Sequence, residues 1–137
     1  MRFVFFLLAL CMGKIRKIVR ALLATFLGAV GVLHFVKPEP FVAIMPKMFP
    51  APLFLVYLSG FFEIAGAVGL LIPKTRRAAS IGIMALLIAV FPANINMAIN
   101  HIQLPGLPEQ SVFMLWLRLA FQPLYIYLAW WVGRQPT

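Results

Sequence analysis

The sequence has few acidic side chains: among 137 residues there are three, against twelve Lys and Arg, which gives a net charge of +9. Only 11% of the residues are charged, whereas 64% are hydrophobic. That balance leaves too little polar surface for a water-soluble domain. The basic residues stand between apolar runs, so the positive charge indicates membrane topology and not nucleic-acid binding. The chain is therefore predicted to lie in a lipid bilayer.

Cysteine is also scarce, and its scarcity excludes two classes of chemistry. The single Cys11 can form neither an internal disulfide nor a C-x-x-C redox pair. One cysteine and two histidines fall short of the four ligands of a structural zinc site, so no metal is expected.

Four apolar runs approach the roughly 20 residues that a membrane-spanning helix needs. They are residues 18–36, 53–72, 78–99 and 112–132. Proline-rich or polar joints separate them, and the first joint holds apolar residues at near-helical spacing over residues 40–49. We therefore predict an all-α integral membrane four-helix bundle of up-down topology, with a short interfacial helix between the first two spans.

The chain is predicted to have two parts: a basic and apolar N-terminal extension at residues 1–17 and the four-helix domain at residues 18–134. The apolar start is too short to span a bilayer, and no small-residue cleavage site or lipoprotein signal follows it. We interpret it either as a membrane-dipping extension of the first helix or as a start codon assigned too early, with Met12 as the true start.

Lys and Arg are distributed unequally between the two sides of the predicted bundle. On one side only Lys37 and Lys47 are found. Many more lie on the other side, which holds both termini and the joint between the second and third spans: Lys14, Arg16, Lys17, Arg20, Lys74, Arg76, Arg77 and Arg134. The positive-inside tendency then predicts that both termini face the cytoplasm.

Glu63 is the leading functional candidate because it lies in the middle of the second apolar run. A charge at bilayer depth costs about 2.5 to 3.5 kcal/mol on insertion scales, so it is retained where something pairs with it or uses it. The helical rise places Glu63 about 15 Å, and Arg118 about 9 Å, below the outer ends of their spans. Since an arginine side chain can extend along the membrane normal, we predict that these two residues pair.

Further polar residues fall in the same outer half of the predicted bundle: His34, Asn94 and Gln122. Pro92 and Pro123 each remove a backbone donor and so loosen the third and fourth helices. Two interpretations remain open. The five residues line a ligand pocket that opens outward, or they are a structural ion pair with amide groups that fix helix register.

Several short motifs, spread over about residues 20–131, resemble those of the DoxX family of small four-helix membrane proteins. They are Gly-Val-Leu-His-Phe at 31–35 with Pro40-Phe41, Ser59-Gly60-Phe61-Phe62-Glu63-Ile64-Ala65-Gly66, Arg76-Arg77 with Ala79, Phe91-Pro92-Ala93-Asn94, and Trp116-Leu117-Arg118-Leu119 with Gln122. The chain departs from the family pattern at Ala120, where a proline is expected, and has Pro123 instead. The fourth-helix kink is therefore expected to be displaced.

The resemblance implies a bundle in the bacterial inner membrane, with His34, Glu63, Asn94, Arg118 and Gln122 as the motif residues. It leaves the activity open, because the family includes subunits linked to a thiosulfate:quinone oxidoreductase, proteins associated with oxidative-stress enzymes, and distant receptor-assembly chaperones. The favoured function is an accessory or assembly subunit that binds a membrane-protein partner or forms a homo-oligomer.

Two alternatives compete with the accessory subunit. In the first, the chain is a quinone-linked oxidoreductase subunit: Arg118, Gln122 or His34 would hydrogen-bond a quinone carbonyl, and Glu63 would move its proton. Such a subunit would need electrons from a partner. In the second, His34 and His101 would carry haem. The sequence requires no cofactor; a quinone is the one favoured over haem.

Overall fold

The structure is a computed structural model that describes residues 2–134, with side chains from residue 11 onward. These residues form α-helices and no strand. The helices are α1 (Arg2–Val36), α2 (Glu39–Ala43), α3 (Pro52–Leu71), α4 (Arg76–Ala89), α5 (Phe91–Ile99) and α6 (Val112–Gly133). Four segments are long and apolar enough to cross a membrane: Cys11–Val36, Pro52–Leu71, Arg76–Ile99 and Val112–Gly133. The predicted all-α class with four long apolar helices is therefore confirmed.

The helix bounds differ from the sequence prediction at two places. Helix α1 is continuous from Arg2, so it includes the described part of the extension that was set apart at residues 1–17. The third apolar segment is broken at Val90 into α4 and α5. Pro92 explains the break, because it has no N–H for the carbonyl of Ile88 and its ring crowds the preceding turn. Pro123, by contrast, stays inside α6 without ending the helix.

A short helix, α2, is present where the interfacial helix is predicted between the first two long segments, but it is shorter than residues 40–49. The joint that follows α2 is held to the rest of the molecule by Asn96 on α5, which donates from Nδ2 to the carbonyl oxygen of Ile44 at 2.8 Å. The Ile44 side chain is buried in a cluster with Met97 and Leu115. The proline-rich joint therefore packs against α5 and α6.

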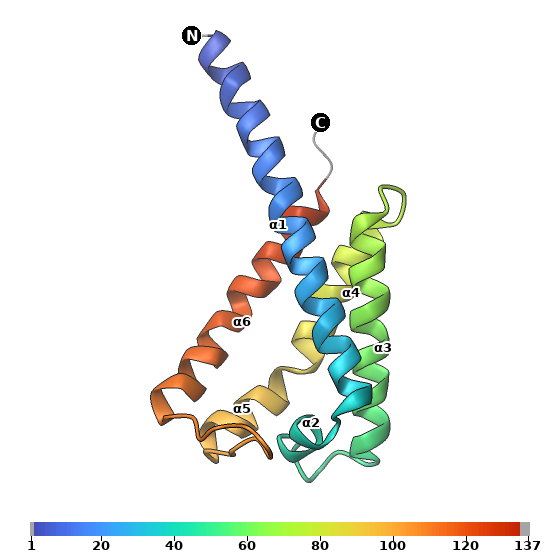
Figure 1. Ribbon diagram of the computed structural model, residues 1–137, viewed down its shortest axis with the longest axis vertical. Coiled ribbons are helices and arrows are strands. Elements are labelled where there is room, and N and C mark those ends of the chain that lie inside the picture. Colours follow the sequence, from blue (N-terminus) through green and yellow to red (C-terminus); the bar gives the residue numbers. More distant parts are fainter. Residues whose placement is uncertain (1, 135–137) are drawn as a thin grey trace.

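Two glycines let α1 and α3 approach each other closely. A Cβ added at Gly31 would lie 2.9 Å from the carbonyl oxygen of Gly60, and a Cβ added at Gly60 would lie 2.8 Å from the carbonyl oxygen of Gly31. Since small residues are what permit such close backbone contact between membrane helices, these glycines set the spacing of the pair. Because α1 and α3 run in opposite directions (Figure 1), each glycine lies opposite the polar residue of the other helix: a Cβ at Gly31 would lie 3.1 Å from Cβ of Glu63, and a Cβ at Gly60 would lie 2.6 Å from Cβ of His34. The two glycines thereby bring the His34 and Glu63 side chains together.

Helix α6 joins the bundle mainly at its C-terminal end. There Nε of Arg20 on α1 donates to the carbonyl oxygen of Val132 at 3.0 Å, and Oγ of Ser80 on α4 donates to that of Ala129 at 2.8 Å. Towards its N-terminal end, α6 diverges from α1 and is met by α5 instead (Figure 1). The buried core divides accordingly into one cluster at each end of the molecule.

Candidate functional site

The five predicted site residues fall in three separate places. His34 and Glu63 face each other between α1 and α3. Asn94 on α5 and Gln122 on α6 form a second pair. Arg118 lies on its own, on the exposed surface of α6. Each place has its own chemistry.

The first place is a buried histidine and carboxyl group. Nδ1 of His34 lies 3.3 Å from Oε2 of Glu63, but it also lies 2.8 Å from the carbonyl oxygen of Val30. Because that carbonyl can only accept, Nδ1 carries the hydrogen and donates it to Val30. Oε2 of Glu63 is consequently left without a hydrogen-bond partner among the described residues, although it is buried.

The surroundings of this pair are apolar. The ring of His34 stacks on that of Phe41 from α2, with ring centres 3.7 Å apart. Glu63 is 8% exposed, and the hydroxyl of Ser59, one turn earlier on α3, is also buried without a partner in the described part of the chain. A buried carboxyl without a donor can hold a proton or accept a hydrogen bond from a bound molecule. No group of three His, Cys, Asp or Glu that could hold a metal ion occurs among the described residues.

The second place is an amide network. Nδ2 of Asn94 donates to Oε1 of Gln122 at 2.6 Å, and Nε2 of Gln122 donates to the carbonyl oxygen of Leu87 at 2.7 Å. Leu87 lies in the last turn of α4, just before the break at Val90. Gln122, which is 4% exposed, thus joins α4, α5 and α6. Its amide is used in holding the fold together, as the structural interpretation expects.

The predicted pairing of Arg118 with Glu63 is wrong. Within the described part of the chain, the one acidic side chain that lies within 4.0 Å of a basic side chain is Glu63, and that neighbour is His34. Helix α3 packs on α1, α4 and α2, whereas α6 packs on α4, α5 and α1. The helical rise predicts that Arg118 and Glu63 lie at a similar depth, but it does not predict which helices pack against each other.

Arg118 instead lies on the side of α6 that faces α1. Tyr125 lies near its guanidinium, two turns further along the same side of α6, and the ring of Tyr125 stacks on that of Phe26 from α1 with centres 5.9 Å apart. Phe26 is itself 51% exposed. The arginine therefore occupies the region in which α6 diverges from α1 (Figure 1).

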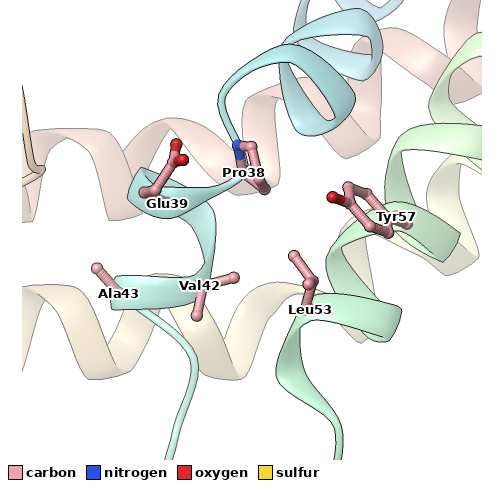
Figure 2. Close-up of a pocket in the computed structure, with 6 residues that line it drawn as sticks. All are labelled: Pro38, Glu39, Val42, Ala43, Leu53 and Tyr57. Carbon is pink, nitrogen blue, oxygen red and sulfur yellow. The ribbon is translucent and has the colours of Figure 1, made fainter.

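Two open hollows lie at the opposite end of the molecule from the C-terminal end of α6 (Figure 1). The first, of about 520 Å³, lies between α2 and α3, where Leu53 and Tyr57 extend from α3 toward α2 (Figure 2). Its lining is Pro38, Glu39, Val42, Ala43, Leu53 and Tyr57. The second is lined by Ala43, Met45, Pro46, Lys47, Met48, Asn96, Asn100 and Ile102. Neither lining includes any of the five predicted site residues.

Sequence reasoning missed that His34 is the neighbour of Glu63, although a signal was present. Gly31 precedes His34 by three residues, and Gly60 precedes Glu63 by three. On a helix this spacing places the glycine and the polar residue on one face. Two antiparallel helices that approach along these faces place each glycine opposite the polar residue of the other helix, and so bring the histidine and the carboxyl group together.

We expect Glu63→Gln to leave the protein as stable as before or to raise its free energy of unfolding by about 1 kcal/mol. The substitution keeps the shape of the side chain and removes a charge that accepts no hydrogen bond in its buried site. The measurement is denaturant unfolding in detergent micelles, followed by circular dichroism. Glu39→Gln on the exposed start of α2 is the control and should change nothing. A loss of more than about 1 kcal/mol for Glu63→Gln would show that its carboxylate is stabilised by a partner.

One family model, described as a domain of unknown function (DUF8561), matches residues 23–133. No curated protein matches the sequence, and no solved structure does.

Proposed function

Since the chain belongs to the DUF8561 family over most of its length, and that description names no activity, we propose a function from the residues of the chain itself. The protein is an accessory subunit of a membrane complex. The α6 face that carries Arg118 binds a transmembrane helix of a partner protein, and a carboxylate of that helix pairs with the guanidinium.

We also propose how the chain crosses the membrane and in which membrane it lies. The four long apolar segments cross the membrane in an up-down order, with both termini in the cytoplasm, and the membrane is a bacterial inner membrane. The clustering of Lys and Arg beside the termini supports the orientation. The resemblance of the chain to the DoxX family supports the location and an assembly role.

The observation that carries the proposal is an exposed arginine inside a span. Arg118 is about 9 Å along α6 from Val112, it is exposed although its side of the helix faces α1, and it forms no ion pair with an acid among the described residues. A charge at that depth is costly in lipid and is retained where it is paired or used. A carboxylate on a neighbouring helix is the partner that a guanidinium binds best.

The partner is a different protein and not a second copy of this chain. The one acid inside the spans, Glu63, is buried between α1 and α3. The other two acids, Glu39 and Glu109, lie outside the four membrane-crossing segments. A second copy therefore offers no accessible carboxylate at the depth of Arg118.

Arg118→Ala should abolish co-purification of the partner and leave the stability of the chain itself nearly unchanged. Truncation of one member of a buried charge pair at an interface costs about 2 to 5 kcal/mol, which corresponds to roughly 30-fold weaker binding or more. The measurement is affinity purification from mildly solubilised native membranes, with partner bands quantified by mass spectrometry. Arg77→Ala, which removes an exposed arginine outside this face, is the control and should retain the partner.

A decrease in the unfolding free energy of the isolated chain on Arg118→Ala, with unchanged co-purification, would contradict the proposal. That result would assign Arg118 to the internal stability of the fold. Arg118→Lys adds a finer test, because lysine keeps the charge but loses the bidentate geometry of the guanidinium. We expect the lysine variant to bind the partner with intermediate strength.

A quinone-linked subunit is the second candidate, and one specific observation favours it. Arg118 lies beside the stacked rings of Phe26 and Tyr125, so a quinone carbonyl could accept from the guanidinium while its ring packs against aromatic surface. Organic extraction of the purified protein followed by quinone chromatography separates the two functions. A stoichiometric quinone that is lost in Arg118→Ala, without change in co-purification, would favour this second function.

A further inference from the structure

Three arginines meet at the end of the molecule where the C-terminal end of α6 adjoins α1 and the joint between α3 and α4 lies nearby (Figure 1). They are Arg16 and Arg20 on α1 and Arg76 at the start of α4. Arg76 and Arg16 are both close enough to Arg20 to repel its charge. These three arginines form the basic site.

Arg20 is the central member of the basic site and is 7% exposed. Its Nε donates to the carbonyl oxygen of Val132 at the end of α6, which fixes the guanidinium between α1 and α6. Arg76 is fixed in a similar way, since its Nε donates to the carbonyl oxygen of Leu70 at 3.1 Å, in the last turn of α3. Both guanidinium groups are thus held in place by backbone carbonyls.

Arg16 completes the basic site, and its hydrogen-bonding capacity is not fully used. Its guanidinium lies over the ring of Trp131 on α6, 5.2 Å from the ring centre. Its Nε is buried and has no hydrogen-bond partner among the described residues. A buried donor without an acceptor is unfavourable, and more so when it belongs to a charged group.

No acidic side chain of the described residues lies at this end of the molecule. Its three acids are Glu39, Glu63 and Glu109, and in the described residues none of them lies within 4.0 Å of an arginine or lysine side chain. Further basic residues surround the basic site in sequence: Lys14, Lys17, Lys74, Arg77 and Arg134. Among the described residues no acid offsets the mutual repulsion of the three arginines, so an anion from outside the chain would relieve it.

We propose that the basic site binds the phosphodiester group of an anionic phospholipid. Phosphate oxygens match the donor geometry of clustered guanidinium groups. The basic site lies at the level where three apolar segments begin or end, namely the ends of α3 and α6 and the start of α4. Tryptophan is typical of the membrane interface, and α6 carries Trp130 and Trp131 at this level. A basic pocket between helices at that level is where lipid headgroups are bound. This inference does not depend on the proposed partner of Arg118.

The test uses the full chain, reconstituted in phosphatidylcholine nanodiscs that contain a minor fraction of phosphatidylglycerol. Native mass spectrometry after release into detergent counts the phosphatidylglycerol molecules retained. Arg16→Gln is the main variant, because Arg16 donates no hydrogen bond that holds the helices together, and Arg76→Gln is a second. We expect about fivefold weaker retention for each arginine removed. Lys37→Gln is the matched control, because it also removes one positive charge but lies on an exposed segment at the opposite end of the molecule from the basic site. It should leave the retention of phosphatidylglycerol unchanged.

Two results would overturn the inference. The first is equal loss of phosphatidylglycerol in Arg16→Gln and Lys37→Gln, which would indicate attraction by net charge alone. The second is protection against thermal unfolding by inorganic phosphate, without selective retention of phosphatidylglycerol over phosphatidylcholine. That result would assign the basic site to a soluble phosphate. Arg16→Lys serves as the folding control, since it keeps the charge and should retain more lipid than Arg16→Gln.

Discussion

Gly60→Ala should lower the free energy of unfolding by about 2 to 3 kcal/mol. The added Cβ would lie 2.6 Å from Cβ of His34 and 2.8 Å from the carbonyl oxygen of Gly31, and a backbone oxygen cannot move aside without moving α1. The two helices must therefore separate, and His34 and Glu63 with them. Denaturant unfolding in detergent micelles, followed by circular dichroism, measures the change.

Gly28→Ala is the matched control for this prediction, because Gly28 lies one turn before Gly31 on the same helix. A Cβ at Gly28 would meet only Cβ of Ala67, at the ordinary contact distance of 3.7 Å. Alanine also favours the helix by up to about 1 kcal/mol over glycine, so this variant should be as stable as the original or more so. Equal destabilisation by both substitutions would show that α1 and α3 are not spaced by the contact between Gly31 and Gly60.

Gln122→Leu should lower the free energy of unfolding by about 3 kcal/mol. The leucine fills a similar volume but leaves the amide of Asn94 and the carbonyl oxygen of Leu87 without their partner. Both groups are then held in a place with little access to water, where an unpaired polar group is costly. Unfolding in detergent is again the measurement, and Gln103→Leu, whose hydrogen bonds are exposed, should cost much less.

A double variant distinguishes a mutual network from two independent contacts. When Asn94→Leu is combined with Gln122→Leu, fewer unpaired groups remain, so the combined loss should be clearly smaller than the sum of the two single losses. Strictly additive losses would mean that the two amides do not depend on each other, and the joining of α5 to α6 would need another explanation.

The helices themselves could be predicted from the sequence, because apolar length and proline positions are local properties. The run at residues 53–72 became α3 (Pro52–Leu71), and the run at residues 112–132 became α6 (Val112–Gly133). Pro92 was recognised as a place where the third helix loosens, and the structure turns this into a full break at Val90. A proline in the sequence does not show whether the helix will bend or break. That outcome depends on which groups donate hydrogen bonds to the backbone carbonyls that the proline leaves without a donor.

The site was predicted less well, because contacts between helices are not local. The depth of each residue was available from helical rise, and depth alone paired Arg118 with Glu63. The missing information was the order of the helices around the bundle, which brings α3 against α1 and leaves α6 beside α4 and α5. That order is set by side-chain packing such as the contact of Gly31 with Gly60. In the proposed function, the carboxylate that pairs with Arg118 belongs to another protein, so no pattern within this chain points to it.

Binding of a partner through Arg118 is tested most directly by photo-crosslinking in native membranes. A photoreactive phenylalanine analogue replaces Phe121, which is exposed on α6 near Arg118, and a control protein carries the analogue at the exposed Val68 on α3. We expect position 121 to give one dominant crosslinked protein, distinct from this chain, that disappears when Arg118→Ala is introduced and is not formed from position 68. Crosslinks from position 121 to lipid or to a second copy only, or an unchanged product in the Arg118→Ala protein, would contradict the proposed function.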